Sequence, residues 1–345
     1  MTLILRNVRP WGKKGLTDVA LSEGRIAAIG QGLPDGSDEV DGRGGTLLPG
    51  LHDHHLHILA LAARRQSVDL TGVLDVTEIA RRLAASPAPF VRAVGYDERA
   101  SGLPDAAELD RWLPDRPLRI QDRTGALWIL NSAALALLNQ HELPAGSERD
   151  ENEASTGRFW REDRWLGRHI PRLALDLAGL GKDLANLGLT ALTDASAANG
   201  PDEAHILSGG IQQRLTIMGS EALASGADYA LGPLKLLIDE RDPPSPDALA
   251  ARIREARMTG RNVAAHCVTE AELLIFLAAL DTTGGVKTGD RIEHGSLIPE
   301  DIIPMIAELG LTVVTNPAFV HDRGDRYVEE IEDASDIYRI GSLLS

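Results

Sequence analysis

The sequence predicts an α/β protein in which a TIM-type (β/α)8 barrel follows a small N-terminal β-module. The chain has 345 residues, enough for a barrel of roughly 250 residues and an appendage. From Thr46 onward, apolar strand-like segments alternate with helical ones, which is typical of a parallel sheet with crossover helices. Residues 1–45 contain only short strand-like segments and turns. We therefore expect a β-module over 1–45 and a barrel over 46–345.

The first 45 residues carry three short segments rich in Leu, Ile and Val, at residues 2–8, 16–22 and 25–30. The turn-forming stretches Trp11-Gly12 and Glu23-Gly24-Arg25 separate them, so each segment reads as a strand.

The barrel region shows a series of apolar strand-like segments. Among them are Phe90–Val94, Leu118–Ile120, Leu189–Thr193, Leu234–Ile238, Val263–His266, Arg291–His294 and Leu311–Thr315. Five stretches between or after them have apolar residues at three- and four-residue spacing, which predicts helices. These are Ser132–Asn139, Leu173–Leu187, Asp247–Thr259, Thr269–Leu280 and Pro299–Leu309. Residues 144–158 are polar and rich in turn formers, which predicts an exposed insertion or lid, and Trp160 and Trp165 lie beside it.

Composition limits the classes of partner. The formal net charge is −16, and an acidic surface repels the nucleic-acid backbone, so we expect a small-molecule substrate and no nucleic acid. Cys267 is the only cysteine, which favours a reducing compartment, so we expect a cytoplasmic location. The N-terminus has no leader pattern and no apolar run approaches about 18 residues, so we expect no membrane association.

The strongest chemical signal is the run Pro49-Gly50-Leu51-His52-Asp53-His54-His55-Leu56-His57. On an extended backbone, side chains two residues apart point the same way, so His55 and His57 can bind one divalent metal ion. The end of the first barrel strand is where barrel enzymes place their active sites. His52 and His54 alternate to the other face and are expected to pack or support the ligands.

Three further residues at strand ends strengthen the metal-site hypothesis. His266 and His294 end consecutive strand segments, each before a turn and a new helix. Lys235 lies inside an apolar strand, where an unpaired ammonium group is costly. The alternatives for Lys235 are a side chain that extends to solvent or an ion pair with Asp239.

Other residues are candidates for supporting roles. Asp53 is expected to orient a loop or a ligand histidine, and Asp194 either faces the site or caps a helix. Trp128 and Asn131 are candidate substrate contacts. Cys267 follows His266 and should point away from the ligand side, because strand side chains alternate.

The motif Pro-Gly-x-x-Asp-x-His-x-His, a strand lysine and one histidine on each of the next two strands together resemble the amidohydrolase superfamily of metal-dependent hydrolases. The segments Asn131-Ser132-Ala133-Ala134-Leu135 and Asp290-Arg291-Ile292-Glu293-His294-Gly295 are similar to the amidohydrolase family 3 branch that includes N-substituted formamide deformylases. The resemblance covers essentially the whole chain.

The resemblance implies a ligand set and a reaction. His55 and His57 would hold the more buried metal ion, and His266 and His294 a second, with Lys235, carboxylated by carbon dioxide, between them. One or two ions are implied; zinc suits these ligands best, although other divalent metals are accepted. Water activated by such an ion hydrolyses a carbon–nitrogen bond other than a peptide bond in a small amide, formamide or cyclic amide.

The sequence departs from the superfamily pattern at its end. Family members continue into an eighth strand whose aspartate takes the proton from the attacking water, and this sequence stops at Ser345, so that residue is expected beyond it. The N-terminal β-module is then half of a composite β-sandwich.

Three alternatives follow: an inactive fragment, a degenerate barrel that acts as a binding module, or the same site serving deamination. The sequence does not distinguish a monomer from a homo-oligomer.

Overall fold

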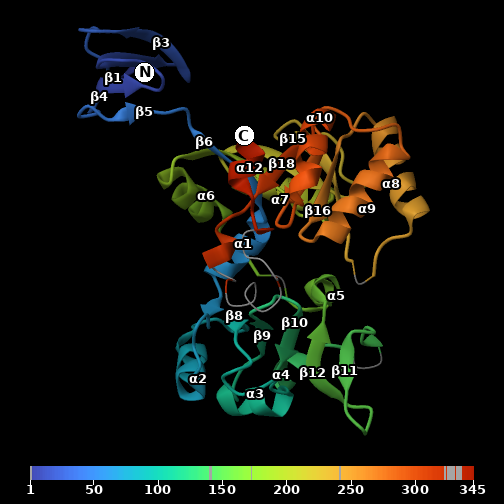
Figure 1. The fold of residues 1–345 in the computed structure, drawn as a ribbon. Coiled ribbons are helices and arrows are strands. Elements are labelled where there is room, and N and C mark those ends of the chain that lie inside the picture. The colour runs from blue at the N-terminus through green and yellow to red at the C-terminus, as the bar shows by residue number, and fades with distance from the viewer. Residues whose placement is uncertain are drawn as a thin grey trace.

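The computed structural model describes residues 2–139, 142–171, 173–240, 242–321, 324, 331 and 336–345. Within them the chain builds three sheets: an N-terminal β-module, a parallel barrel sheet and a mixed sheet inserted between the first two barrel strands (Figure 1). None of the helices in these ranges combines the length and apolar character that a membrane crossing requires.

The N-terminal module is a sheet with strand order β3-β2-β1-β4, and β5 pairs with β1. Its strands are β1 (Thr2–Pro10), β2 (Thr17–Ser22), β3 (Arg25–Gly30), β4 (Asp38–Asp41) and β5 (Thr46–Leu47). Glu23 and Gly24 join β2 to β3 with φ angles of 52° and 72°, the left-handed pair that a tight two-residue hairpin requires. Ile26 and Ile29 on β3 are 63% and 59% exposed, so one face of this sheet is open to solvent.

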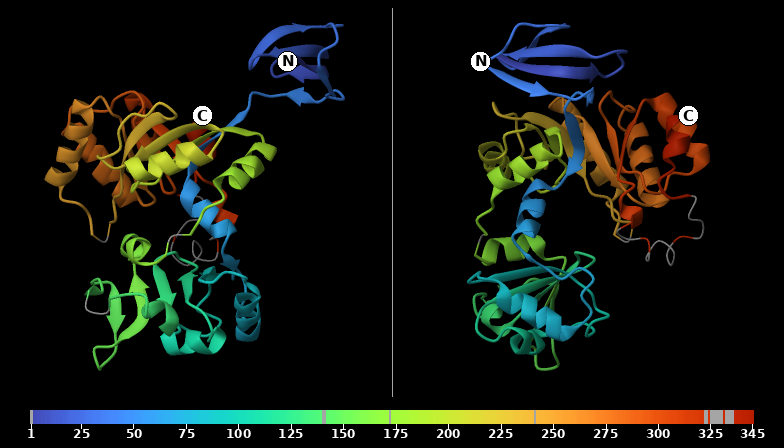
Figure 2. Two further views of the ribbon diagram at one scale, coloured as in Figure 1. Left: turned by 180° about the vertical axis from the view of Figure 1, so that it is seen from behind. Right: turned by 90° about the vertical axis from the view of Figure 1, so that its left-hand side faces the viewer.

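The barrel sheet has seven parallel strands in the order β18-β17-β16-β15-β14-β13-β6. They are β6 (Leu51–Leu56), β13 (Leu189–Asp194), β14 (Arg214–Gly219), β15 (Ala230–Leu236), β16 (Val263–Cys267), β17 (Arg291–His294) and β18 (Thr312–Thr315). The sheet curls into a nearly closed barrel (Figure 2), and a groove lies between its edge strands β6 and β18. The prediction of a TIM-type barrel with a leading β-module is confirmed.

Helices cover the outside of this sheet. They are α1 (Ile58–Arg65), α6 (Leu177–Asn186), α7 (Pro201–Gly210), α8 (Pro246–Met258), α9 (Glu270–Asp281), η2 (Glu300–Ile302), α10 (Ile303–Leu309) and α12 (Ile340–Leu344). Strand alternation sends Leu234 and Leu236 outward into the core against α8 and α9, while Lys235 between them points inward. The main barrel core therefore lies between sheet and helices, and the interior holds polar groups together with the small apolar cluster of Ala195, Met218 and Ala264.

The strands expected at Phe90–Val94 and Leu118–Ile120 are not barrel strands. They are β8 (Val91–Tyr96) and β9 (Leu118–Asp122), in a separate sheet of order β11-β12-β10-β9-β8-β7. The other members of this insert are β7 (Val68–Asp69), α2 (Val76–Ala85), α3 (Ala106–Trp112), β10 (Leu127–Leu130), α4 (Ser132–Leu135), β11 (Ser147–Arg149), β12 (Ser155–Trp160) and α5 (Asp163–His169).

The insert is mixed, because β9, β10, β12 and β11 pair antiparallel while β7, β8 and β9 pair parallel. The expected lid at 144–158 is partly the hairpin β11–β12, and Phe159 at its end is fully buried. Periodicity alone could not separate the two sheets, since a buried strand has the same pattern in either. Figure 1 shows β6 and α1 running from the barrel toward this insert.

Candidate metal centre

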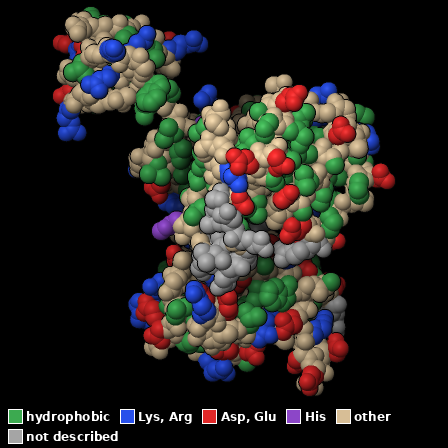
Figure 3. All heavy atoms as spheres, viewed as in Figure 1, with side chains coloured by type: hydrophobic (Ala, Val, Ile, Leu, Met, Phe, Trp, Pro, Cys, Tyr) green, Lys and Arg blue, Asp and Glu red, His purple; other side chains and the backbone are tan. Residues whose placement is uncertain are grey.

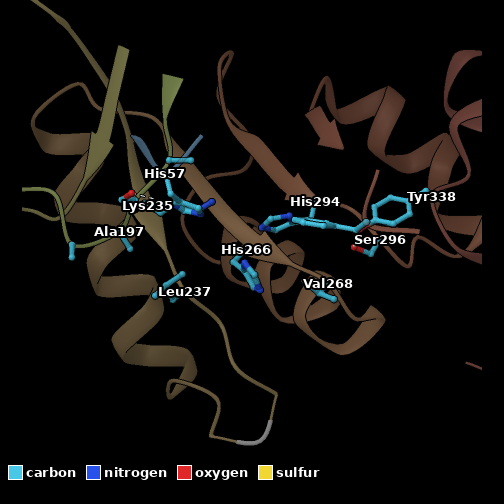
Figure 4. Close-up of a pocket in the computed structure, with 13 residues that line it drawn as sticks. His57, Ala197, Lys235, Leu237, His266, Val268, His294, Ser296 and Tyr338 are labelled. Carbon is cyan, nitrogen blue, oxygen red and sulfur yellow. Dashed lines mark hydrogen bonds between the residues drawn. The ribbon is translucent and has the colours of Figure 1, made fainter. Parts of the chain in front are cut away.

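The histidines predicted as ligands lie together at the carboxyl ends of β6, β16 and β17. The ring centroids of His55 and His294 are 4.5 Å apart, those of His266 and His294 4.6 Å, and those of His55 and His57 5.3 Å. Figure 4 shows His57, Lys235, His266 and His294 around one cavity of about 480 Å³. The tertiary structure thus brings together five residues that are up to 239 positions apart in the sequence, from His55 to His294.

Strand alternation places Lys235 and His266 in the barrel interior. The residues on either side of them, Leu234 and Leu236 on β15 and Ala265 and Cys267 on β16, belong to the outer core. Cys267 therefore points away from the cavity, and its burial raises the pKa of its thiol far above the usual range. A catalytic thiol on this strand is excluded.

His294 reaches the same interior by a different route. Ile292, two residues earlier on β17, packs in the outer core, so regular alternation would send His294 outward as well. The φ angle of His294 is instead 69°, a left-handed conformation that is rare for a residue with a side chain. This turn lets both Glu293 and His294, adjacent in sequence, face the barrel interior.

Three buried nitrogen atoms of the cluster have no hydrogen-bond partner among the described residues: His55 Nε2, His294 Nδ1 and Lys235 Nζ. A buried polar atom without a partner is costly, unless it serves a ligand. A divalent metal ion, which accepts nitrogen lone pairs, fits the two imidazole nitrogens, whereas Lys235 Nζ has a lone pair only after it loses its proton. No three His, Cys, Asp or Glu side chains in the described ranges form a ready cage for one ion, so the fit rests on the unpartnered nitrogens.

Burial keeps His266 and His294 neutral. Together with the positive charges of Lys235 and of the neighbouring rings, it lowers the pKa of His266 to about 4 and that of His294 to about 2. A neutral imidazole has a free lone pair at pH 7, which is the form that binds a metal.

Lys235 is only 2% exposed, so the alternative in which it extends to solvent is wrong. Its Nζ lies 3.9 Å from Glu293 Oε2, and Asp239 is paired with Arg161 at 2.7 Å. Burial lowers the Lys235 pKa to about 8, although the charge of Glu293 acts against this. At mildly alkaline pH a larger share of this lysine is therefore the neutral, nucleophilic amine than is usual for lysine.

Asp194 supports the site from β13. Its carboxylate accepts hydrogen bonds from the Ile58 backbone at 2.7 Å, from the Ser196 backbone at 2.9 Å and from Asn199 Nδ2 at 2.8 Å. Asp194 therefore caps α1, the helix that starts directly after His57. Ser196 Oγ also lies 2.9 Å from His57 Nδ1.

Asp53 and the two other histidines of the motif lie on the groove side of β6. Asp53 Oδ1 accepts a hydrogen bond from the His55 backbone at 2.9 Å. The rings of His52 and His54 pack at 3.9 Å, and His52 Nε2 lies 2.9 Å from Thr193 Oγ1. None of the three lines the cavity of the cluster.

The structure does not bring Trp128 and Asn131 to this cavity. Trp128 is buried in the insert, donates to Asp163 at 2.7 Å and has two guanidinium groups, of Arg92 and Arg119, 4.9 Å from its ring centroid. Asn131 is fully buried, and its side-chain amide forms hydrogen bonds with four backbone groups, one of them in the first turn of α4. Both residues serve the fold of the insert.

Sequence reasoning gave no role to Glu293, Arg291, Ser196 or Tyr338. Glu293 is fully buried and bonded to His55 Nδ1 and, at 2.7 Å, to Arg291. Tyr338 lines the cavity and shares a hydrogen bond of 3.1 Å with Ser296. A signal for Glu293 was present, because a carboxylate inside a predicted parallel strand, which is buried on both faces, raises the same question as Lys235.

Apolar side chains make up much of the cavity lining. Leu237, Val268 and Phe319 line it together with Ala197 and Ala198, and Ser296 and Tyr338 provide hydroxyl groups. Its volume is in the range that accommodates small molecules.

Comparisons with known proteins agree with this architecture. The structure matches that of a metal-dependent hydrolase of Pyrococcus horikoshii with a TM-score of 0.76 at 20% identity, over all of this chain and 80% of the other. A similar protein of Pyrococcus furiosus gives 0.75 at 20% identity, over 100% and 83%. At these identities the likeness concerns the fold.

The matches to sequence relatives cover smaller shares of those proteins. A dihydroorotase of Mycobacterium tuberculosis is 43% identical over 60 residues, 17% of this chain and 14% of that enzyme. The Bacillus subtilis protein YtcJ, named as an amidohydrolase, is 24% identical over 84% of this chain and 65% of its own length. The chain thus spans less than two thirds of these relatives. The model of the amidohydrolase family matches residues 38–345, which is most of the chain, and the protein therefore belongs to the amidohydrolase family.

Proposed function

We propose that the protein is a metal-dependent hydrolase that cleaves a carbon–nitrogen bond, other than a peptide bond, in a small amide, formamide or cyclic amide. The observation that carries this proposal is the set of unpartnered nitrogens of His55, His294 and Lys235, buried among four histidine rings beside a cavity. The finer resemblance to N-substituted formamide deformylases stays a prediction.

The proposed ligands are His55, His57, His266 and His294, with Lys235 between them. Neutral imidazoles favour zinc among the common divalent ions. When bound, such an ion polarises a carbonyl group and lowers the pKa of water. Carboxylation of Lys235 would replace a costly buried cation by an anion, and the burial of its Nζ without a hydrogen bond supports this part of the proposal.

The chain's own residues would hold and orient the substrate. The apolar lining residues Leu237, Val268 and Phe319 would contact an apolar substituent, and Ser296 and Tyr338 would meet the polar amide. Apolar walls also exclude water from the reacting bond, which strengthens electrostatic interactions in the site. A substrate with one apolar side and one amide group fits this arrangement.

The first test is elemental analysis of the purified chain and of the variants His55→Ala, His266→Ala and Lys235→Met. We expect about one or two zinc or similar ions per chain, and a reduced content in each variant. His205→Ala is the matched control, since His205 is an exposed histidine on α7.

The second test is a hydrolysis screen of the metal-loaded protein with N-substituted formamides and cyclic amides, detected by amine release or ring opening. Metal-dependent release supports the proposal. A chain that binds no metal, or that releases amine equally with a chelator present, would contradict it and favour a non-catalytic binding role.

A further inference from the structure

Among the residues that the structure describes, Glu293 is the one fully buried carboxylate whose side chain contacts the ring of a proposed ligand. Its Oε2 is hydrogen-bonded to His55 Nδ1, and its Oε1 accepts a hydrogen bond of 2.7 Å from Arg291 Nε. Lys235 Nζ lies 3.9 Å away, beyond hydrogen-bond distance. Both carboxylate oxygens are thus committed to His55 and Arg291.

Arg291 extends the contact from β17 to β6. Its Nη2 donates to the His54 carbonyl oxygen at 2.8 Å. Arg291 and Glu293 are two residues apart on β17, so both point into the barrel, where they hold the backbone of residue 54 and the ring of residue 55. In the described part of the chain β6 pairs with β13 alone, so this contact supports the edge that has no strand partner.

The contact also determines which nitrogen of His55 carries a proton. A carboxylate only accepts hydrogen bonds, so His55 Nδ1 must donate. In a neutral imidazole the lone pair is then on Nε2, and this atom is buried, unpartnered and on the ring that lies 4.5 Å from His294. We infer that Glu293, held by Arg291, is a positioning residue that keeps the lone pair of His55 on Nε2 for a divalent metal ion.

This inference rests on the proposed metal site, but its first readout does not require metal. In the metal-free protein labelled with ¹⁵N-histidine, ring correlation spectra assigned with His55→Ala should show His55 protonated on Nδ1. Glu293→Gln should give a mixture of tautomers, because an amide both donates and accepts. His55 protonated on Nε2 in the unsubstituted protein would overturn the inference, whether or not Glu293→Gln folds.

The second readout is affinity for Zn²⁺ and Co²⁺, measured by competition with a chromophoric chelator. We expect Glu293→Gln to weaken binding by about 10- to 100-fold, the usual loss for such a partner of a ligand histidine. The Co²⁺ absorption bands should keep their positions, because the ligands are unchanged. An affinity within twofold of the unsubstituted protein, or shifted bands that indicate a lost ligand, would contradict the positioning role.

Asp290→Asn is the matched control. Asp290 is also fully buried, lies next to β17 and pairs with Arg257, but its contacts are with Val263 and Lys287 backbone groups away from the cluster. It should lower the unfolding midpoint without changing metal affinity. If the unsubstituted protein binds no metal, the proposed function fails, while the tautomer measurement still decides the inference.

Discussion

His294 shows at the scale of one residue how backbone and chemistry are linked. Its φ of 69° would be unfavourable for almost any side chain, yet that angle directs the imidazole into the cluster. Strained residues of this kind cost about 1–3 kcal/mol and are concentrated at functional sites. The conformation that places this proposed ligand therefore lowers the stability of the fold.

The first prediction concerns this backbone conformation. His294→Gly should be more stable than His294→Ala by about 1 kcal/mol, because only glycine adopts the left-handed region without a steric penalty. Denaturant unfolding of both variants without metal measures the difference. Ala265→Gly, in regular β16, should instead lower the free energy of unfolding. Equal stability of the two position-294 variants would argue against a strained angle.

The second prediction concerns pH. The folded protein holds the pKa of His266 at about 4 and that of His294 at about 2, whereas an unfolded histidine has a pKa near 6.5. Below about pH 6.5 these two histidines are protonated in the unfolded chain but stay neutral in the folded one. The free energy of unfolding therefore falls as pH falls toward 4, by up to about 1.4 kcal/mol per pH unit and per group.

Unfolding midpoints of metal-free protein between pH 7 and pH 5 test this, because the carboxylates titrate mostly below that window. His266→Asn should reduce the slope, and His205→Asn should not. A slope that His266→Asn leaves unchanged would contradict the assignment.

At the scale of elements, α1 links the histidine motif to the neighbouring strand. Helix α1 begins directly after His57, and its first backbone N–H donates a hydrogen bond to the Asp194 carboxylate on β13. The side chain that caps the helix is thus 136 residues away in sequence. This contact joins β6, α1 and β13 at the carboxyl ends where the cluster lies.

The third prediction follows from this cap. Asp194→Ala should lower the free energy of unfolding by roughly 3 kcal/mol, because it leaves several buried donors without an acceptor. Hydrogen exchange should rise in the first turn of α1. Asp202→Ala, an exposed acidic residue in α7, should change stability by less than about 1 kcal/mol. A comparable loss in both variants would mean that the cap has no special role.

At the scale of the whole molecule, the insert and the barrel have separate cores. Residues such as Leu109, Ile120 and Ile129 form one cluster in the insert, while Ile253 and Phe276 belong to a cluster between β15–β17 and helices α8–α10. The acidic and basic side chains are interspersed over the face seen in Figure 3, and the β-module stands apart from the barrel in the same view. Separate cores allow separate local stabilities.

The fourth prediction uses this separation. Leu109→Ala should cost about 2–5 kcal/mol within the insert, because it opens a cavity in a fully buried core. Hydrogen exchange followed by mass spectrometry should then rise over residues 68–160 and stay unchanged in β15–β17, with the metal content preserved. Ile253→Ala should show the reverse distribution. Faster exchange in both regions after Leu109→Ala would show that the two parts unfold together.

Local sequence patterns predict the barrel class, the ends of most barrel strands and the five residues of the cluster. They do so because strand periodicity is local, because Lys235 and His266 follow ordinary alternation, and because His55 and His57 stand two residues apart where the first barrel strand ends. The same local rules could not tell that β8 and β9 leave the barrel, since the pairing partner of a strand is a long-range property.

The support of the cluster depends on contacts between segments that are far apart in the sequence. The bond between Glu293 and His55 joins residues 238 positions apart, and the turn at His294 breaks the alternation on which sequence reasoning depends. Trp128 and Asn131 are candidate substrate contacts by residue type alone, but hydrogen bonds within the insert occupy both side chains. Residue type and spacing indicate which groups carry the chemistry, whereas contacts between distant segments determine which atoms of those groups are left free to act.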